Sequence, residues 1–180
     1  VYKRQGHSDV QGGAIAYKGD ASIGEQLADK RRLTGGVLSP FNAWLISRGL
    51  QTLYCRMERH CATAQLVAEA LDGIGEIARV RYPWLPHHPS YEVARKQMSS
   101  GGAMISIEME GGKEAAIRVA SNVKLFVNAT SLGGVESLIE HRASVEGPAS
   151  TTSPGLLRLS IGLENPDDLI GDLRSAIAAA

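Results

Sequence analysis

The chain has 180 residues, 43% of them hydrophobic and 21% charged, which excludes a disordered or collagen-like protein and allows one domain with part of a second. Nineteen basic and nineteen acidic residues cancel to a net charge of 0, so no whole-molecule field attracts nucleic acid or an anionic membrane. Because no apolar run approaches the roughly 20 residues that cross a bilayer, and no signal peptide is evident, we expect a cytoplasmic protein.

The first forty residues predict one strand and one helix. The segment from Gly6 to Asp20 is rich in glycine, and its short apolar stretch at residues 13–17 predicts a buried strand. Residues 23–33 mix apolar and charged side chains, which is typical of a surface helix. The chain opens with Val1 rather than with methionine and runs straight into a polar turn, so we expect it to be the back part of a longer protein.

A long helix is predicted from residue 39 to residue 73. Ser39 supplies a capping hydroxyl and Pro40 suits the first helical position. Apolar residues then recur at helical spacing as far as Gly73, a residue typical of a helix C-cap. Because more than thirty residues is long for one globular helix, we expect a bend at Gly49 and a linking role between two domains. Cys55 and Cys61 fall inside this helical pattern, six residues apart, and form neither a CxxC pair nor a disulfide framework.

From residue 74 onward strands and helices alternate, which predicts a small α/β domain with a mostly antiparallel sheet and helices on one side. The final helix has a cap at Asn165, a proline in its first turn and an apolar stripe behind it. A loop between Ser144 and Gly155 fits no element. The predicted strands are 77–82, 103–109, 123–127, 135–139 and 156–161, and the predicted helices before Asn165 are 91–98 and 114–121.

Several residues are candidates for chemistry, each with a plainer alternative. The run Gly6-His7-Ser8-Asp9 could let a cofactor or substrate approach the backbone, or it could be a polar turn before a strand. Arg158, in the middle of a strand and facing away from the apolar side, could bind a carboxylate, or it could be a salt-bridged sheet arginine.

Two further segments also have a functional and a plainer interpretation. The turn from Ser131 to Gly134 offers free amides and a hydroxyl to an anion, or it is an ordinary loop. His87 and His88 have no Cys, Asp or Glu at ligand spacing, which favours a solvated loop over a metal site, and we predict no bound metal.

Taken together, these segments resemble the cysteine/methionine-metabolism (trans-sulfuration) family of pyridoxal-phosphate enzymes, which includes cystathionine γ-synthase, cystathionine γ-lyase, methionine γ-lyase and the homoserine sulfhydrylases. The match covers nearly the whole chain in the family's order. The matching segments are Gly6-His7-Ser8-Asp9-Val10 with Gly12-Gly13, Ser39-Pro40-Phe41 with Trp44, Arg48-Gly49-Leu50 with Thr52-Leu53, Arg56-Met57-Glu58, Tyr82-Pro83, Arg95 with Gln97-Met98, Ser131 to Leu138, and Leu157 to Glu164.

The resemblance implies a fold and an activity for the parent protein. The fold is the C-terminal small domain of a fold-type I pyridoxal-phosphate enzyme together with the tail of the large cofactor domain. Residues 6–38 would end the large domain, 39–73 would form the linking helix, and 74–180 would form the small domain. The parent would act by γ-elimination or γ-replacement on a homoserine ester or a sulfur amino acid, with pyridoxal 5'-phosphate as cofactor, as a homotetramer.

The resemblance also assigns roles to individual residues. Arg158 matches the family arginine that holds the substrate's α-carboxylate, Ser131 matches a residue beside it, and the segment Gly6-His7-Ser8 lies near the cofactor. The lysine that forms the Schiff base is expected at the position of Tyr2, and is therefore absent.

The opening of the chain departs from the family altogether. We expect residues 1–5 to be non-native and derived from an adapter, and the chain by itself to be inactive. The alternative is a stand-alone binding or assembly module without catalysis. A second departure is the stretch from Ala143 to Gly147, where many members carry Met-Thr-His near the substrate entrance, so no single member's substrate is transferred.

Overall fold

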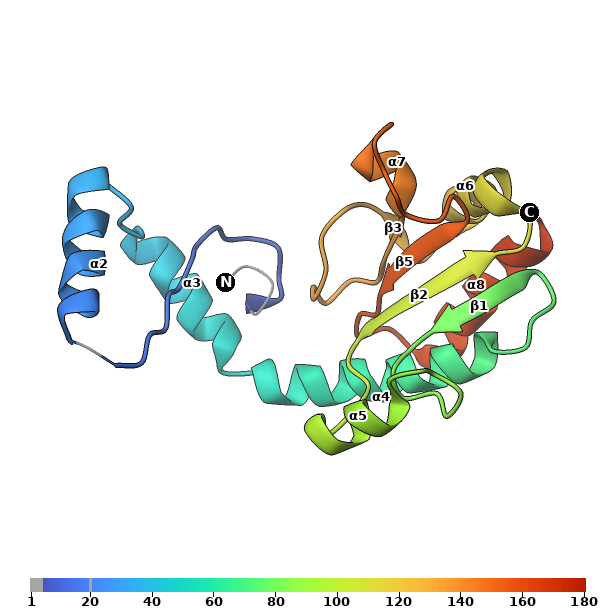
Figure 1. The fold of residues 1–180 in the computed structure, drawn as a ribbon, viewed down its shortest axis with the longest axis horizontal. Coiled ribbons are helices and arrows are strands. Elements are labelled where there is room, and N and C mark those ends of the chain that lie inside the picture. Colours follow the sequence, from blue (N-terminus) through green and yellow to red (C-terminus); the bar gives the residue numbers. More distant parts are fainter. Residues whose placement is uncertain (1–4, 20) are drawn as a thin grey trace. The chain divides into compact units, whose positions relative to one another are not determined.

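A computed structural model describes residues 5–19 and 21–180 (Figure 1). Contacts divide the chain into two compact units, Val1–Leu53 and Tyr54–Ala180, and each is described by itself. Among the described residues, none of the helices combines the length and the apolar character needed to cross a membrane.

The first unit holds two helices and an irregular segment. Helix α2 (Ala21–Thr34) buries none of its residues, which agrees with the predicted surface helix. Helix α3 (Pro40–Leu50) begins as predicted, with the Ser39 hydroxyl accepting a hydrogen bond from the Asn42 N–H at 3.2 Å.

The strand predicted at residues 13–17 is wrong. This segment has no regular structure, and its two large apolar side chains are exposed, Ile15 at 74% and Tyr17 at 55%. The apolar run predicted burial, but a strand also needs a neighbouring strand to pair with its backbone groups. The described part of the first unit contains none.

The long helix predicted from residue 39 is divided in two. Helix α4 (Leu53–Leu71) follows α3 after a turn at Gln51 and Thr52, two residues beyond the bend that we predicted. At Gly49 itself the backbone of residue 5 approaches closely, since an added Cβ would lie 2.7 Å from the Gln5 carbonyl oxygen. Glycine is therefore needed there for packing within the first unit.

The second unit is built on a five-stranded sheet in the order β1-β2-β5-β4-β3 (Figure 1). All neighbouring strands are antiparallel except β3 and β4, as the sequence predicted for most of the sheet. Strand β5 comes last in the chain but lies at the centre, between β2 and β4. The strands are β1 (Ile77–Arg81), β2 (Met104–Met109), β3 (Val127–Asn128), β4 (Leu138–His141) and β5 (Leu156–Ser160).

Helices cover one face of this sheet, as predicted. The core joins inward side chains of β2 and β5, such as Ile107 and Leu159, to apolar residues of three helices. These helices are α4, α6 (Gly112–Asn122) and α8 (Pro166–Ala178), and two shorter helices, α5 (Tyr91–Gln97) and α7 (Arg142–Glu146), complete the unit. Strand residues that alternate with the buried ones face away from these helices, and Arg158 is one of them.

The strand predicted at residues 123–127 is reduced to Val127 and Asn128. The backbone N–H groups just before Val127 donate hydrogen bonds to a side chain instead of to a neighbouring strand. Asp172, on α8, accepts hydrogen bonds from the N–H groups of Lys124 at 2.8 Å, Leu125 at 2.9 Å and Phe126 at 3.4 Å. Backbone donors bound to a carboxylate cannot also pair with a neighbouring strand.

We expect replacement of Asp172 by alanine to lower the free energy of unfolding of the second unit by about 1–2 kcal/mol, because three donors lose their acceptor. Urea unfolding of the full chain measures this change. Asp168→Ala, in the exposed first turn of the same helix, is the matched control and is expected to cost about 0.5 kcal/mol. Equal losses of unfolding free energy in the two variants would show that the hydrogen bonds to Asp172 do not stabilise this segment.

Candidate functional site

The guanidinium of Arg158 lies on the sheet face opposite the core, at the centre of a small polar site. Leu157 and Leu159 on either side are fully buried, which turns the side chain of Arg158 to the other face. Its Nη2 donates to the carbonyl oxygen of Ser131 at 2.8 Å and to Oε2 of Glu140 at 2.9 Å. The side chain stays 22% exposed. The structure thus brings together the two residues that the sequence proposed for this site.

Glu140 is the buried anion beside Arg158, and sequence reasoning missed it. It lies on β4 directly opposite Arg158 in the sheet register, and only 2% of its side chain is exposed. Its second oxygen, Oε1, accepts a hydrogen bond from Nη1 of Arg142 at 2.7 Å. A buried carboxylate is costly unless it is paired, and this one has a cation at each oxygen.

The charges continue outward from Arg142 into the loop that fitted no predicted element. Nε of Arg142 donates to Oε1 of Glu146 at 2.8 Å, and the hydroxyls of Ser150 and Thr152 donate to Oε2 of the same carboxylate, each at 2.6 Å. Hydrogen bonds to Glu140 and Glu146 raise the pKa of Arg142. Hydrogen bonds from Ser150, Thr152 and Arg142 lower the pKa of Glu146. Cations and anions therefore alternate from Arg158 to Glu146.

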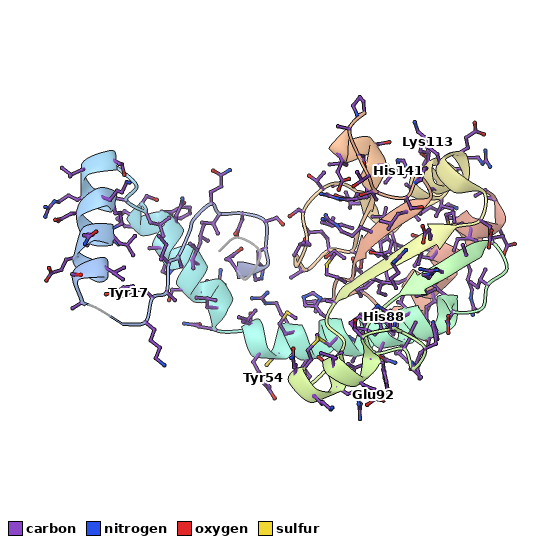
Figure 2. The ribbon with its side chains drawn as sticks, viewed as in Figure 1. Tyr17, Tyr54, His88, Glu92, Lys113 and His141 are labelled. Atoms are coloured by element: carbon purple, nitrogen blue, oxygen red, sulfur yellow. The ribbon has the colours of Figure 1, made fainter. Side chains whose placement is uncertain are left out.

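His141, labelled in Figure 2, is the last residue of β4 and contacts both ends of the same loop. One ring nitrogen, Nδ1, lies 2.6 Å from the hydroxyl of Ser144, and the other, Nε2, lies 2.7 Å from the carbonyl oxygen of Pro154. The loop is thereby tied to the strand that carries Glu140.

The turn that begins at Ser131 is tied to β5 at two points. Ser131 adopts a φ of 109°, in the region that favours glycine, and its carbonyl accepts the bond from Arg158. Two residues on, the N–H of Gly133 donates to the hydroxyl of Ser160 at 2.9 Å. Because Arg158 and Ser160 are two residues apart on one strand, both attachments lie on one face of the sheet.

A buried polar network holds the other end of this turn. Ser137, Gly162 and Glu164 of this network lie in segments that resemble the family, but sequence reasoning assigned them no function. The carboxylate of Glu164 accepts hydrogen bonds from the N–H and the hydroxyl of Ser137, both at 2.7 Å. The same hydroxyl accepts from the N–H of Gly162 at 2.8 Å, and Nδ1 of His60 on α4 lies 3.0 Å from the Gly162 carbonyl oxygen. Ser137, at the end of segment 131–137, is thus held by Gly162 and Glu164 just beyond β5, and Gly162 in turn contacts His60 of α4.

The segment Gly6-His7-Ser8 belongs to the first unit. Gly6 and Ser8 have φ values of 82° and 56°, so the backbone turns sharply at both. His7 bonds twice to Gln5, from its N–H to Oε1 at 2.9 Å and between Nδ1 and the carbonyl oxygen at 2.8 Å. A place near a cofactor stays a prediction for these residues. Tyr2, where the lysine is expected, lies outside the described residues.

The two adjacent histidines have ordinary surroundings in the second unit. Nδ1 of His88 accepts from the N–H of Ser90 at 3.2 Å, and Nε2 of His87 lies 3.6 Å from Asp72. Burial and the neighbouring His87 lower the pKa of His88. Within residues 5–19 and 21–180, no three His, Cys, Asp or Glu side chains converge as metal ligands would.

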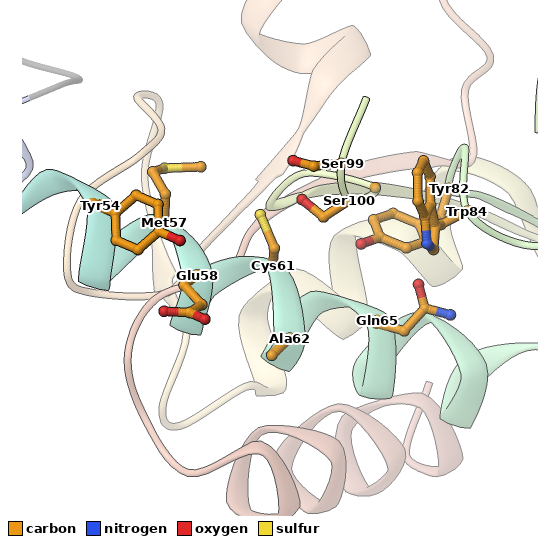
Figure 3. A pocket seen from close by; sticks show the side chains of 11 residues that line it. Tyr54, Met57, Glu58, Cys61, Ala62, Gln65, Tyr82, Trp84, Ser99 and Ser100 are labelled. Carbon is orange, nitrogen blue, oxygen red and sulfur yellow. The ribbon is translucent and has the colours of Figure 1, made fainter. Parts of the chain in front are cut away.

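An open cleft of about 610 Å³ lies in the second unit between α4 and the segments around residues 82–84 and 99–101 (Figure 3). The hydroxyl of Tyr82 at its wall donates to the carbonyl oxygen of Gly102 at 3.0 Å. Burial is the main cause that raises the pKa of this hydroxyl, and Cys61 adds to it. The sequence did not reveal the cleft, because its lining comes from three separate segments.

Comparison with known proteins identifies the family. The sequence profile described as "Cys/Met metabolism PLP-dependent enzyme" matches residues 4–178. The chain belongs to this family. The predicted family and fold class are therefore confirmed.

Several relatives in the Cys/Met metabolism family are closely similar to this chain. An L-methionine gamma-lyase of Porphyromonas gingivalis is 46% identical over an alignment of 180 positions, which covers 96% of this chain and 45% of the relative. A cystathionine gamma-synthase of Mycobacterium tuberculosis is 44% identical over an alignment of 177 positions, which also covers 96% of this chain and 45% of the relative. The chain thus spans less than half the length of these relatives.

Solved structures of the family show the same fold. The cystathionine gamma synthase of Xanthomonas oryzae pv. oryzae, in complex with cystathionine, is 42% identical with a TM-score of 0.90, over 98% of this chain and 47% of that one. A cystathionine gamma-lyase from Micromonospora echinospora is 38% identical with a TM-score of 0.92, over 99% and 48%.

The resemblance implies a lysine in the complete protein whose amine condenses with the aldehyde of pyridoxal phosphate. The position expected for it, Tyr2, lies outside the described residues, so this attachment point stays a prediction. What the described residues do fit is a carboxylate ligand, since a guanidinium and a polar turn meet at Arg158.

Proposed function

We propose that this chain supplies the substrate-carboxylate end of a pyridoxal-phosphate-dependent trans-sulfuration enzyme. In this proposal Arg158 binds the α-carboxylate of the amino-acid substrate, and Ser131 shapes the site beside it. The substrate is a homoserine ester or a sulfur amino acid, and the complete protein is a cystathionine γ-synthase, a γ-lyase or a homoserine sulfhydrylase. Pyridoxal phosphate belongs to the complete protein, and the contribution of this chain is binding and orientation.

The arrangement of the donors on Arg158 carries this proposal. A guanidinium has five N–H donors, of which the two on Nη2 are directed to Ser131 and Glu140. Nε and Nη1 have no acceptor among the residues that the structure describes, and the side chain is partly exposed. The free N–H groups and the positive charge of this immobilised guanidinium can bind an anionic ligand such as a carboxylate. The relatives' names support the substrate class, because methionine and cystathionine both carry an α-carboxylate.

The organisation of the complete protein is proposed from the resemblance. Residues 6–38 end the large cofactor domain, 39–73 link the domains, and 74–180 form the small domain. The complete protein is a cytoplasmic homotetramer, and Gly6, His7 and Ser8 lie near its cofactor.

The alternative is that the chain is a binding or assembly module without catalysis. Tyr2 favours this alternative, because the resemblance places the catalytic lysine at its position. Such a module has no need of an arginine with free donors, so a role for Arg158 in binding substrate separates the two.

We expect Arg158→Ala in the complete protein to raise the KM for the amino-acid substrate about 100-fold, because two charge-assisted hydrogen bonds of about 1.5 kcal/mol each are lost and each 1.4 kcal/mol is tenfold. Steady-state kinetics measures KM, and the absorbance of the bound cofactor checks that loading is unchanged. Arg81→Ala is the matched control, since Arg81 pairs with Glu108 at the same 2.9 Å on this sheet without touching Arg158. An unchanged KM in Arg158→Ala would remove Arg158 from the site.

A further inference from the structure

Arg158 does not stand alone, because it shares the carboxylate of Glu140 with a second arginine. Glu140 is almost fully buried, and its two oxygens lie 2.9 Å from Nη2 of Arg158 and 2.7 Å from Nη1 of Arg142. The side chains of Arg158 and Arg142 are 22% and 34% exposed, so both cations reach solvent on the side that Glu140 does not occupy. The three groups form a compact cluster with a net charge of +1.

The pair of Arg158 and Glu140 would by itself attract a carboxylate poorly. Such a pair is neutral, and its carboxylate would repel an incoming carboxylate at close range. Glu140 still orients the guanidinium, because it fixes Nη2 from the neighbouring strand. The cost of that orientation is a negative charge beside the binding atoms, and a second cation is needed to offset it.

Arg142 is placed to offset this charge. Its bond to Glu140 is shorter than that of Arg158, and its guanidinium is charged at neutral pH, as that of any arginine is. Arg142 also bonds to Glu146, whose side chain is 30% exposed and accepts hydrogen bonds from the hydroxyls of Ser150 and Thr152. Solvent screens Glu146 more strongly than the buried Glu140.

On the basis of the function proposed above, we propose that Glu140 and Arg142 are positioning residues that set the affinity of Arg158 for the substrate carboxylate. Glu140 orients the guanidinium, and Arg142 neutralises Glu140 so that the positive charge of Arg158 is available to the ligand. Neither residue needs to touch the substrate.

The test compares two ligands that differ by the carboxylate alone. The complete protein, loaded with its cofactor, is titrated with 2-aminobutyrate and with propylamine, and the two dissociation constants are measured from the absorbance of the cofactor. For Arg142→Ala we expect Kd for 2-aminobutyrate to rise about tenfold and Kd for propylamine to change less than twofold. Arg142→Lys, which keeps the charge, should stay within about threefold for both ligands, and Arg81→Ala should leave both constants unchanged.

If the role of Arg142 were purely structural, Arg142→Ala would raise Kd for both ligands by the same factor, and that result would overturn the proposal. So would an unchanged constant for 2-aminobutyrate. Should Arg142→Ala fail to fold, Arg142→Gln makes the same test, because glutamine is neutral and keeps a hydrogen-bond donor for Glu140.

Arg158→Ala in the same titration separates this proposal from the function on which it rests. If Arg158→Ala selectively weakens the binding of 2-aminobutyrate and Arg142→Ala does not, the positioning role of Arg142 is wrong, whereas the proposed function is supported. If Arg158→Ala also binds 2-aminobutyrate normally, the carboxylate-binding function itself fails.

Discussion

Replacing Glu140 with alanine is expected to lower the free energy of unfolding of the second unit by about 3 kcal/mol. The substitution removes the buried anion between Arg158 and Arg142 and leaves two guanidinium groups that repel each other without a shared partner. Removing one member of a buried pair costs about 3–5 kcal/mol, and the partial exposure of both arginines places the loss at the lower end. Urea unfolding in a Trp44→Phe background measures it, because Trp84 then reports the second unit alone.

The matched control is Glu108→Ala, which breaks the pair with Arg81 on the same sheet. That pair is more exposed to water, so we expect a loss of less than about 1 kcal/mol. Glu140→Gln should fall between the two, because glutamine keeps one oxygen acceptor for one arginine. If Glu140→Ala and Glu108→Ala were equally stable, the buried carboxylate of Glu140 would not stabilise the second unit more than the exposed pair does.

Alanine at Gly162 is expected to be comparably damaging, with a loss of about 3 kcal/mol. An added Cβ would collide with the carbonyl oxygen of Val135 and with a carboxylate oxygen of Glu164, and would lie 2.6 Å from the carbonyl carbon of Glu136. Two of these contacts are with backbone, which cannot swing aside. The segment 131–137 must move away from β5, and the hydrogen bond from the Gly162 N–H to Ser137 is lost with it.

The same displacement has a functional consequence, because segment 131–137 begins with the residue that holds Arg158. We therefore expect Gly162→Ala to weaken binding of 2-aminobutyrate by the complete protein more than binding of propylamine. The control is Gly171→Ala in α8, where an added Cβ meets nothing within 4 Å and should stabilise the helix by about 0.5–1 kcal/mol. A Gly162→Ala variant as stable as Gly171→Ala would show that the close approach does not constrain the turn.

Local patterns predicted the elements that depend on local physics. The cap at Asn165, whose side chain accepts from the Asp167 N–H, and the apolar stripe behind it located α8. Alternation located β2 and β5 to within one residue, because a strand buried on one face must alternate. The same reasoning placed Arg158 on the face away from the core.

Features that depend on distant partners could not be predicted in this way. The pairing of Glu140 with Arg158 depends on the register between β4 and β5, which no local pattern encodes. The shortening of β3 depends on Asp172, more than forty residues further along the chain. The apolar run at 13–17 predicted a strand that has no partner in the described part of its unit. In each case the missing information was tertiary.

The central place of β5 has a consequence for biosynthesis. Ribosomes make proteins from the N-terminus, so β2 and β4 are complete before residues 156–160 exist to pair with both of them. Until then each strand presents an open edge that can pair with another chain. The sheet therefore closes late, through contacts between residues far apart in sequence, and such folds form slowly. During translation, the nascent chain must keep these edges from aggregating until its last strand arrives.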